Sequence, residues 1–259
     1  MIKVFTDTES LSRGAADLFA TAAEQAVAAR GRFSVLISGG ETPRRTYDLL
    51  ARDPFCQRIP WKYVHLFWGD ERCVAATDPR SNAHMARCTL LDRVPLPEQQ
   101  IYPMVCQGAP QMAASNYERV LRAHFPDGVA SFDLVMLGLG DDGHTASLFP
   151  GAATLEEQHY WVMPTQKPGE DIMRVTVTTP LLNQARQVVF LVSGPGKATV
   201  LQRVLEGPYI PGELPAQLIK PLYGTVLWYV EESASRLLTT REKVQENDRS
   251  GPNYSPSRS

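Results

Sequence analysis

Short apolar runs alternate with helix-like segments along most of this 259-residue chain. The runs have the length of strands and are apolar at nearly every position: residues 2–6, 33–37, 63–68, 132–138, 187–193 and 225–230. Such runs, separated by helices, are typical of a mostly parallel sheet that is buried on both faces. The pattern therefore predicts an α/β protein.

The intervening segments are predicted to be helices, and residues 10–30 carry apolar residues with a spacing near 3.6. The predicted helices are residues 10–30, 43–51, 81–91, 110–125 and 197–206. No internal repeat and no Gly/Ser-rich linker divides the chain, so we predict one α/β catalytic domain over residues 1–244. Residues 245–259 are polar and lack hydrophobic periodicity, which predicts a disordered tail.

Composition narrows the possible partners. The formal net charge of −2 gives no electrostatic reason to expect nucleic acid or a membrane surface. No apolar run approaches the ~20 residues of a membrane span, and the N-terminal segment does not resemble a signal peptide. The cysteines form no Cys-x-x-Cys pair and do not cluster with histidines: Cys56, Cys73, Cys88 and Cys106. We therefore expect no metal site, and a reduced, cytoplasmic location.

In an open parallel sheet, ligands bind beyond the carboxyl ends of the strands. The first such loop reads Ser38-Gly39-Gly40-Glu41-Thr42-Pro43. Its glycines permit close backbone approach to a ligand, and Thr42 and Pro43 suit the N-cap and first position of a helix. Free N–H groups there could hold a phosphate. An ordinary strand-to-helix turn would need the same glycines.

The second loop contains Gly69-Asp70-Glu71-Arg72, followed by Arg80 and Asn82. Carboxylates and guanidinium groups at a strand end could hold sugar hydroxyls and a phosphate. A surface ion pair is the competing interpretation. In a further loop, Lys197 stands in Ser193-Gly194-Pro195-Gly196-Lys197, where a helix follows a strand. Its cation could hold phosphate or a developing negative charge, or could be only solvated.

The third loop, residues 138–145, reads GLGDDGHT and contains a formal G-x-G-x-x-G. A dinucleotide site is rejected because Asp141 and Asp142 would repel a pyrophosphate, and no strand ending in an acid follows about 20 residues later. His144 beside these carboxylates could act as a general base, although a lone histidine is often structural. We expect a helix to start at residues 146–149.

Four motifs, ISGGETP, WGDER, LGLGDDGHTASLFPG and SGPGKA, occur in this order. Together they resemble the 6-phosphogluconolactonases, which share a superfamily with glucosamine-6-phosphate deaminase and ribose-5-phosphate isomerase. The resemblance covers about residues 10–235. It implies a three-layer, modified Rossmann-like α/β/α fold without a cofactor. It also implies hydrolysis of a small sugar-phosphate lactone in the pentose phosphate pathway by a monomer or weak homo-oligomer.

The resemblance also implies roles for individual residues. His144 would be the general base, supported by Asp142 or Asp141, with Asp70 as a further catalytic candidate. Substrate would contact Ser38, Gly39, Gly40, Thr42, Arg72, Arg80, Asp141, Arg174 and Lys197. Arg174 matches an arginine that the family tends to carry before the strand MRVTVTTPLLN. The division of labour between phosphate binding and charge stabilisation stays open.

Neutral His144 would take a proton from water as the water attacks the lactone carbonyl. No Gly-x-Ser-x-Gly elbow is present, so a serine acyl-enzyme is not indicated. Two other functions remain. One is a sugar-phosphate deaminase or isomerase on the same scaffold. The other is a non-catalytic sugar-phosphate-binding regulator.

Overall fold

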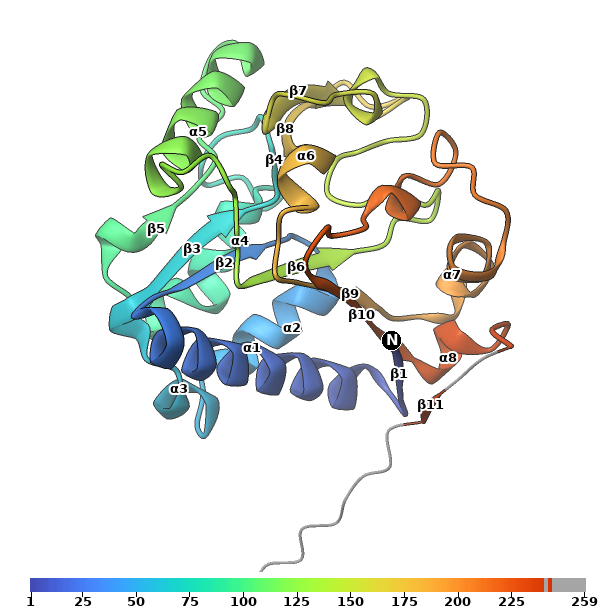
Figure 1. The fold of residues 1–259 in the computed structure, drawn as a ribbon, viewed down its shortest axis with the longest axis horizontal. Coiled ribbons are helices and arrows are strands. Elements are labelled where there is room, and N and C mark those ends of the chain that lie inside the picture. Colours follow the sequence, from blue (N-terminus) through green and yellow to red (C-terminus); the bar gives the residue numbers. More distant parts are fainter. Residues whose placement is uncertain (240–241, 244–259) are drawn as a thin grey trace, which may run out of the picture.

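The computed structural model describes residues 1–239 and 242–243. The expectation of a disordered tail at residues 245–259 falls outside the described residues. Most of the described chain forms one α/β unit around a central sheet (Figure 1).

The central sheet has the strand order β11-β1-β10-β9-β6-β2-β3-β5, and its strand pairs are parallel. Its strands are β1 (Ile2–Phe5), β2 (Phe33–Ile37), β3 (Val64–Trp68), β5 (Ile101–Tyr102), β6 (Leu134–Gly138), β9 (Gln187–Val192), β10 (Thr225–Glu231) and β11 (Glu242–Lys243). All six strands predicted from apolar runs are present, which confirms the predicted α/β class.

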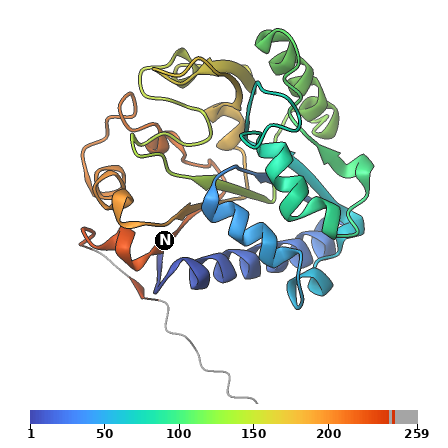
Figure 2. The same cartoon turned by 180° about the vertical axis from the view of Figure 1, so that it is seen from behind.

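Helices cover the sheet on both sides. The helices α1 (Thr8–Arg30), α2 (Glu41–Leu50) and α4 (Asn82–Thr89) form one layer, in which α2 contacts both of the others (Figure 2). On the opposite side lie α5 (Pro110–His124), α6 (Thr179–Leu182) and α7 (Ala198–Glu206). The short helices α3 (Phe55–Arg58) and α8 (Glu232–Ser235) complete the set. This arrangement confirms the three-layer prediction.

A second, antiparallel sheet lies beyond the carboxyl end of β3, and the apolar pattern did not predict it. It has the order β4-β8-β7, from β4 (Asp70–Arg72), β8 (Met173–Val177) and β7 (Val162–Gln166). In its register Asp70 faces Thr176, and Arg72 faces Arg174. Arg174 therefore lies inside a strand, whereas the sequence placed it before one.

Two helix starts differ from the prediction. Helix α2 begins at Glu41 with Gly40 as its N-cap, at a φ of 112° that favours glycine, so Thr42 and Pro43 lie within the first turn. No helix starts at residues 146–149: Thr145 and Leu148 form an isolated bridge, and Ala146 has a φ of 48°. Tertiary contacts of this segment outweigh its local helix signals.

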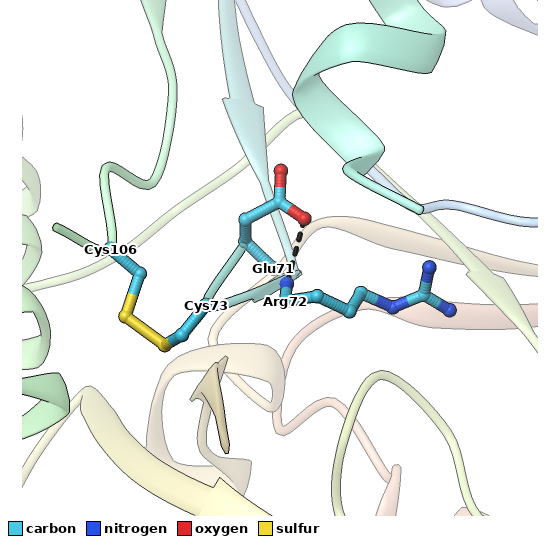
Figure 3. Close-up of a disulfide and its surroundings, with 4 residues drawn as sticks. All are labelled: Glu71, Arg72, Cys73 and Cys106. Atoms are coloured by element: carbon cyan, nitrogen blue, oxygen red, sulfur yellow. Dashed lines mark hydrogen bonds between the residues drawn. A yellow bond between two sulfur atoms is a disulfide. The ribbon is translucent and has the colours of Figure 1, made fainter. Parts of the chain in front are cut away.

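The cysteines also depart from expectation, because Cys73 and Cys106 form a disulfide (Figure 3). The expectation that every cysteine is reduced is wrong for this pair. Cys56 and Cys88 are free. The bridge ties the segment that follows β4 to the loop that follows β5, next to Arg72.

Reduction of this disulfide should destabilise the fold. The bridge closes a loop between residues 33 apart, and a loop of that size stabilises the native state by about 2–4 kcal/mol. We expect a loss of that size in urea unfolding when a thiol reductant is added. The Cys56→Ser protein, which keeps the bridge, should respond as the wild type does, whereas Cys73→Ser should not respond. Identical curves with and without reductant for the wild type would contradict a structural role.

A histidine cluster lies at the amino end of the sheet, away from the loops described above. His124 Nε2 lies 2.8 Å from Ser34 Oγ, and its ring packs against His65, Phe67 and Phe125. Burial is the main cause that lowers the pKa of His124 from 6.5 to about 4, and the charges of His65 and Arg32 lower it further. The imidazole is therefore neutral in the folded protein near pH 7.

This cluster should make the fold sensitive to mild acid. Below pH 6.5 the unfolded chain protonates His124 before the folded chain does, so stability should fall between about pH 6.5 and 4 and level off below that. Partial exposure limits the loss to about 1–2 kcal/mol. Urea unfolding at several pH values measures it. The His124→Gln protein should show a flatter profile, and an equally steep profile would assign the effect to other groups.

Candidate active site

A cavity of about 410 Å³ opens beyond the carboxyl ends of β2, β6 and β9, beside the small sheet. Most of the site residues predicted from the sequence line it: Ser38, Gly39, Gly40, Thr42, Asp70, Arg72, Asp141, His144, Arg174 and Lys197. Asp142 is not among the lining residues but contacts His144. Arg80 also lies outside the lining, ion-paired with Asp78 at the exposed surface.

His144 is held by a tight turn after β6. Gly140 N donates to His144 O at 2.8 Å, and Gly143 N donates to Gly140 O at 3.1 Å. A Cβ at Gly140 would lie 2.0 Å from His144 Nδ1, so the imidazole occupies space that only glycine leaves free. The glycines of this loop therefore serve to seat the histidine.

Asp142 orients the imidazole. Its Oδ1 lies 2.5 Å from His144 Nδ1 and accepts the His144 backbone N–H at 3.1 Å. Burial opposes ionisation of Asp142, yet the hydrogen bonds from His144 and its charge keep the pKa of Asp142 below its usual value. An ionised carboxylate at Nδ1 favours the tautomer with the proton on Nδ1 and leaves Nε2 free to accept one.

Asp141 has a different partner. Its Oδ1 lies 2.6 Å from Nζ of Lys197, whose side chain is only 25% exposed while that of Asp141 is 87% exposed. The sequence left open which of the two aspartates supports the histidine. In this geometry Asp142 contacts His144, and Asp141 fixes the ammonium group of Lys197 at the mouth of the cavity.

Two arginines from the small sheet lie side by side on this cavity. Arg72 and Arg174 are directly paired across β4 and β8 and both line the cavity. Like charges directly opposite in a sheet are destabilising. Both Nε atoms are buried without a hydrogen-bond partner, so each guanidinium keeps an unused donor. A bound anion would supply the missing acceptors and relieve the repulsion.

A buried phenyl ring packs against both the histidine and one of these arginines. The ring centroid of Phe149 lies 4.8 Å from that of His144 and 5.2 Å from the Cζ of Arg174. Glu170 holds the Arg174 guanidinium at 2.6 Å. Phe149 and Glu170 thus fix the Arg174 side chain beside the cavity.

Asp70 joins two of the predicted loops. One carboxylate oxygen accepts the hydroxyl of Ser147 at 2.6 Å, and the other lies 3.2 Å from Asn82 Nδ2. Ser147 lies in the segment that follows His144, whereas Asn82 begins α4. Asp70 is only 5% exposed, and both of its carboxylate oxygens already have hydrogen-bond partners. It is therefore better suited to organising the loops than to accepting a proton from water.

The turn after β2 closes the remaining side of the cavity. Thr42 Oγ1 lies 2.6 Å from Ser193 Oγ, which links this turn to the loop that carries Lys197. Ser38 Oγ is buried without a partner. A Cβ at Gly39 would lie 1.9 Å from Asn82 Oδ1, so the Asn82 amide packs directly on the glycine backbone.

Sequence reasoning did not assign roles to Ser147, Phe149 or Glu170. Ser147 and Phe149 stand inside the GHTASLFPG run that was singled out, and their contacts explain why this string extends beyond the histidine. Glu170 gave no local signal, because its role depends on pairing with Arg174. Among the described residues, no group of three or more His, Cys, Asp or Glu is placed to hold a metal ion.

Comparison with known proteins shows which family the chain belongs to. The family described as glucosamine-6-phosphate isomerases/6-phosphogluconolactonase matches residues 6–228. The chain belongs to this family. It is 41% identical to a 6-phosphogluconolactonase of Synechocystis over 222 residues, which covers 83% of this chain and 88% of that protein.

Other members of the family are similar over more of the chain. The human 6-phosphogluconolactonase is 38% identical over 247 residues, covering 92% of this chain and 94% of its own length. The solved structure of the 6-phosphogluconolactonase from Trypanosoma cruzi superposes with a TM-score of 0.80 at 27% identity, covering 92% and 97% of the two chains. Within the described part of the chain, no helix is long and apolar enough to cross a membrane.

Proposed function

We propose that this protein hydrolyses 6-phospho-D-glucono-1,5-lactone to 6-phospho-D-gluconate, the second step of the oxidative pentose phosphate pathway. Family membership and relatives named 6-phosphogluconolactonase at 38–41% identity support the assignment. The observation that carries it is a histidine, oriented by Asp142, in a cavity that also holds a pair of arginines with unused donors.

His144 Nε2 takes a proton from a water molecule as the water oxygen bonds to C1 of the lactone. The carbonyl becomes an oxyanion, which the nearby ammonium group of Lys197 stabilises. Collapse of the tetrahedral intermediate breaks the bond between C1 and the ring oxygen. The imidazolium returns its proton to that oxygen, so the base is regenerated and the product carries a new hydroxyl and a carboxyl group.

The phosphate group binds between Arg72 and Arg174. Guanidinium forks match the oxygens of a phosphate and form charge-assisted hydrogen bonds with it. The pairing of the two arginines across the sheet fixes their spacing. Phe149 packs against both His144 and Arg174, which supports an arrangement in which a substrate held by its phosphate presents C1 to the base.

Two other functions use the same scaffold. A sugar-phosphate deaminase or isomerase would also need a proton-transfer group and a phosphate site, and release of ammonia or formation of an isomer would identify it. A non-catalytic regulator would bind sugar phosphates without turnover. The oriented His144–Asp142 pair favours catalysis over the regulator.

Purified protein should accelerate hydrolysis of 6-phosphogluconolactone above the spontaneous rate, and activity should survive exhaustive treatment with EDTA. The proposed steps need only side chains, so no metal is required. A pH-stat or a coupled assay with 6-phosphogluconate dehydrogenase measures the rate. Loss of activity on chelation with recovery on adding a divalent ion would contradict the metal-free mechanism, and the absence of hydrolysis would contradict the function.

We also propose that the enzyme is cytoplasmic and is a monomer or weak homo-oligomer. It acts on a small molecule and binds neither nucleic acid nor a membrane. Sedimentation of the purified protein over a range of concentrations tests the oligomeric state, and fractionation of the cell tests the location.

A further inference from the structure

Glu71 is a buried carboxylate on the strand that carries two cavity residues. It is only 3% exposed and stands between Asp70 and Arg72 in β4. Successive side chains of a strand point to opposite faces. Asp70 and Arg72 line the main cavity, whereas Glu71 does not. Figure 3 shows the Glu71 carboxylate and the Arg72 guanidinium extending in different directions from the strand.

Four neutral donors surround this carboxylate. Oε1 accepts the backbone N–H of Arg72 at 2.7 Å and that of Asn82 at 2.8 Å. Oε2 accepts the hydroxyl of Ser81 at 2.9 Å and the backbone N–H of Ala83 at 2.8 Å. Asn82 and Ala83 are the first residues of α4, whose opening N–H groups have no partner within the helix. Glu71 therefore caps α4 from a neighbouring strand.

Two of the groups held by Glu71 carry cavity side chains. Arg72 reaches the cavity with its Nε unused, and its Nη1 donates to the backbone oxygen of Arg80 at 2.6 Å. The amide of Asn82 lies against Gly39 and donates to the backbone oxygen of Asp70 at 2.8 Å. The distance between β4 and the start of α4 thus determines where the phosphate-binding guanidinium and this amide stand.

We propose that Glu71 is a positioning residue of the active site, whose ionised carboxylate locks β4 to the start of α4 so that Arg72 and Asn82 meet the phosphorylated end of the substrate. This inference rests on the proposed lactonase function and adds a residue that does not itself touch the substrate. The charge matters because an ionised carboxylate accepts hydrogen bonds at both oxygens, as the four donors require.

Replacement by Gln is therefore disruptive despite its similar shape. The amide oxygen can replace one carboxylate oxygen, but the NH₂ group would face two donors. Burial is the main cause that raises the pKa of Glu71, and the hydrogen bonds from Ala83, Asn82, Arg72 and Ser81 oppose it. The four hydrogen bonds thus favour the charged form of this buried carboxyl group. A side chain that only filled space at the start of α4 would not need to be charged.

The test is substrate discrimination: kcat/KM for 6-phosphogluconolactone divided by kcat/KM for unphosphorylated gluconolactone. A residue that only stabilises the fold changes the amount of active enzyme and leaves this ratio unchanged. We expect Glu71→Gln to lower the ratio roughly tenfold. Ser81→Ala removes one donor to Glu71 and also the hydroxyl that accepts the His84 N–H at the start of α4; it is the milder variant if Glu71→Gln does not fold, and we expect it to lower the ratio two- to threefold. Glu71→Asp should recover part of the loss.

Asp133→Asn is the matched control. Asp133 is also a buried carboxylate that accepts a backbone N–H, from Ser34 at 2.8 Å, but it lies at the amino end of the central sheet, directly before β6. We expect it to lower stability and keep the wild-type ratio. Calorimetric binding of 6-phosphogluconate should weaken in Glu71→Gln and not in Asp133→Asn.

Failure of the two proposals can be told apart. If the wild type does not hydrolyse the lactone, the proposed function fails, and the binding experiment still tests Glu71. If the wild type is active while the Glu71→Gln and Ser81→Ala proteins keep its substrate ratio and its affinity for 6-phosphogluconate, Glu71 is only structural and the inference is overturned.

Discussion

Replacing His144 with Gln is expected to lower kcat on 6-phosphogluconolactone by roughly 10²–10⁴-fold, the range for loss of a general acid–base group. Glutamine keeps similar bulk beside Gly140 and Phe149 but cannot take a proton from water. The affinity for substrate should change far less, because the arginines that we propose hold the phosphate are untouched. Steady-state kinetics corrected for spontaneous hydrolysis measures both quantities.

The pH profile strengthens this test. Protonation of His144 should reduce kcat/KM on the acid side in the wild type, and that acid limb should disappear from the residual activity of the variant. Asp142→Asn provides a companion, since it keeps the shape but removes the charge that favours the active tautomer. A folded His144→Gln protein with near-normal kcat and an unchanged pH profile would remove His144 from the mechanism and make Asp142 or Asp70 the leading candidate base.

Arg72→Gln should lower kcat/KM for the phosphorylated lactone by roughly 10- to 100-fold, because a charge-assisted hydrogen bond contributes about 1.5–3 kcal/mol. Activity on unphosphorylated gluconolactone should change little. Part of the loss should appear in kcat, since binding energy from the remote phosphate also orients the reacting carbon. Equal efficiency of the wild type on the two lactones would contradict a phosphate site of any kind.

Other arginine variants test whether the loss of kcat/KM is specific to the arginines that line the cavity. Arg203→Gln removes an exposed guanidinium that pairs with Glu213 and does not line the cavity, and it should behave as the wild type. Arg174→Lys keeps the charge but not the planar fork, and should fall between the wild type and Arg72→Gln. Arg80 stays a predicted phosphate contact. Its pairing with Asp78 outside the cavity leads us to expect a smaller effect from Arg80→Gln.

Local pattern predicted six of the eight strands of the central sheet, because these strands are long enough to form apolar runs, and it missed the two-residue strands β5 and β11. Strand β4 could not be found that way, since its residues Asp70, Glu71 and Arg72 are polar and it pairs with β8 about 100 residues later. The missing helix at residues 146–149 has a similar cause. Ser147 is held by Asp70 and Thr176, and these distant contacts outweigh local helix propensity.

The candidate site was predictable to a similar extent. Strand ends of a parallel sheet meet at one edge, so the loops carrying His144, Arg72 and Lys197 could be expected to converge. Which aspartate supports the histidine depends on the turn made by Gly140 and Gly143, and spacing alone did not decide it. The pairing of Cys73 with Cys106 was equally hidden, because connectivity depends on which loops approach each other in space.

Both strands that pair with β1, the first strand in the sequence, come from the last part of the chain. β1 lies between β10 and β11, and Figure 1 shows this blue strand beside the red ones. β10 begins at Thr225, so a ribosome that adds about 5–20 residues per second reaches it roughly 10–45 s after completing β1. During that interval α1 can already pack on β2, but β1 has no strand beside it. Newly made chains should therefore be most open to misassociation at β1. In nascent chains stalled before β10, we expect protection from protease to be lost at β1 and kept at β2.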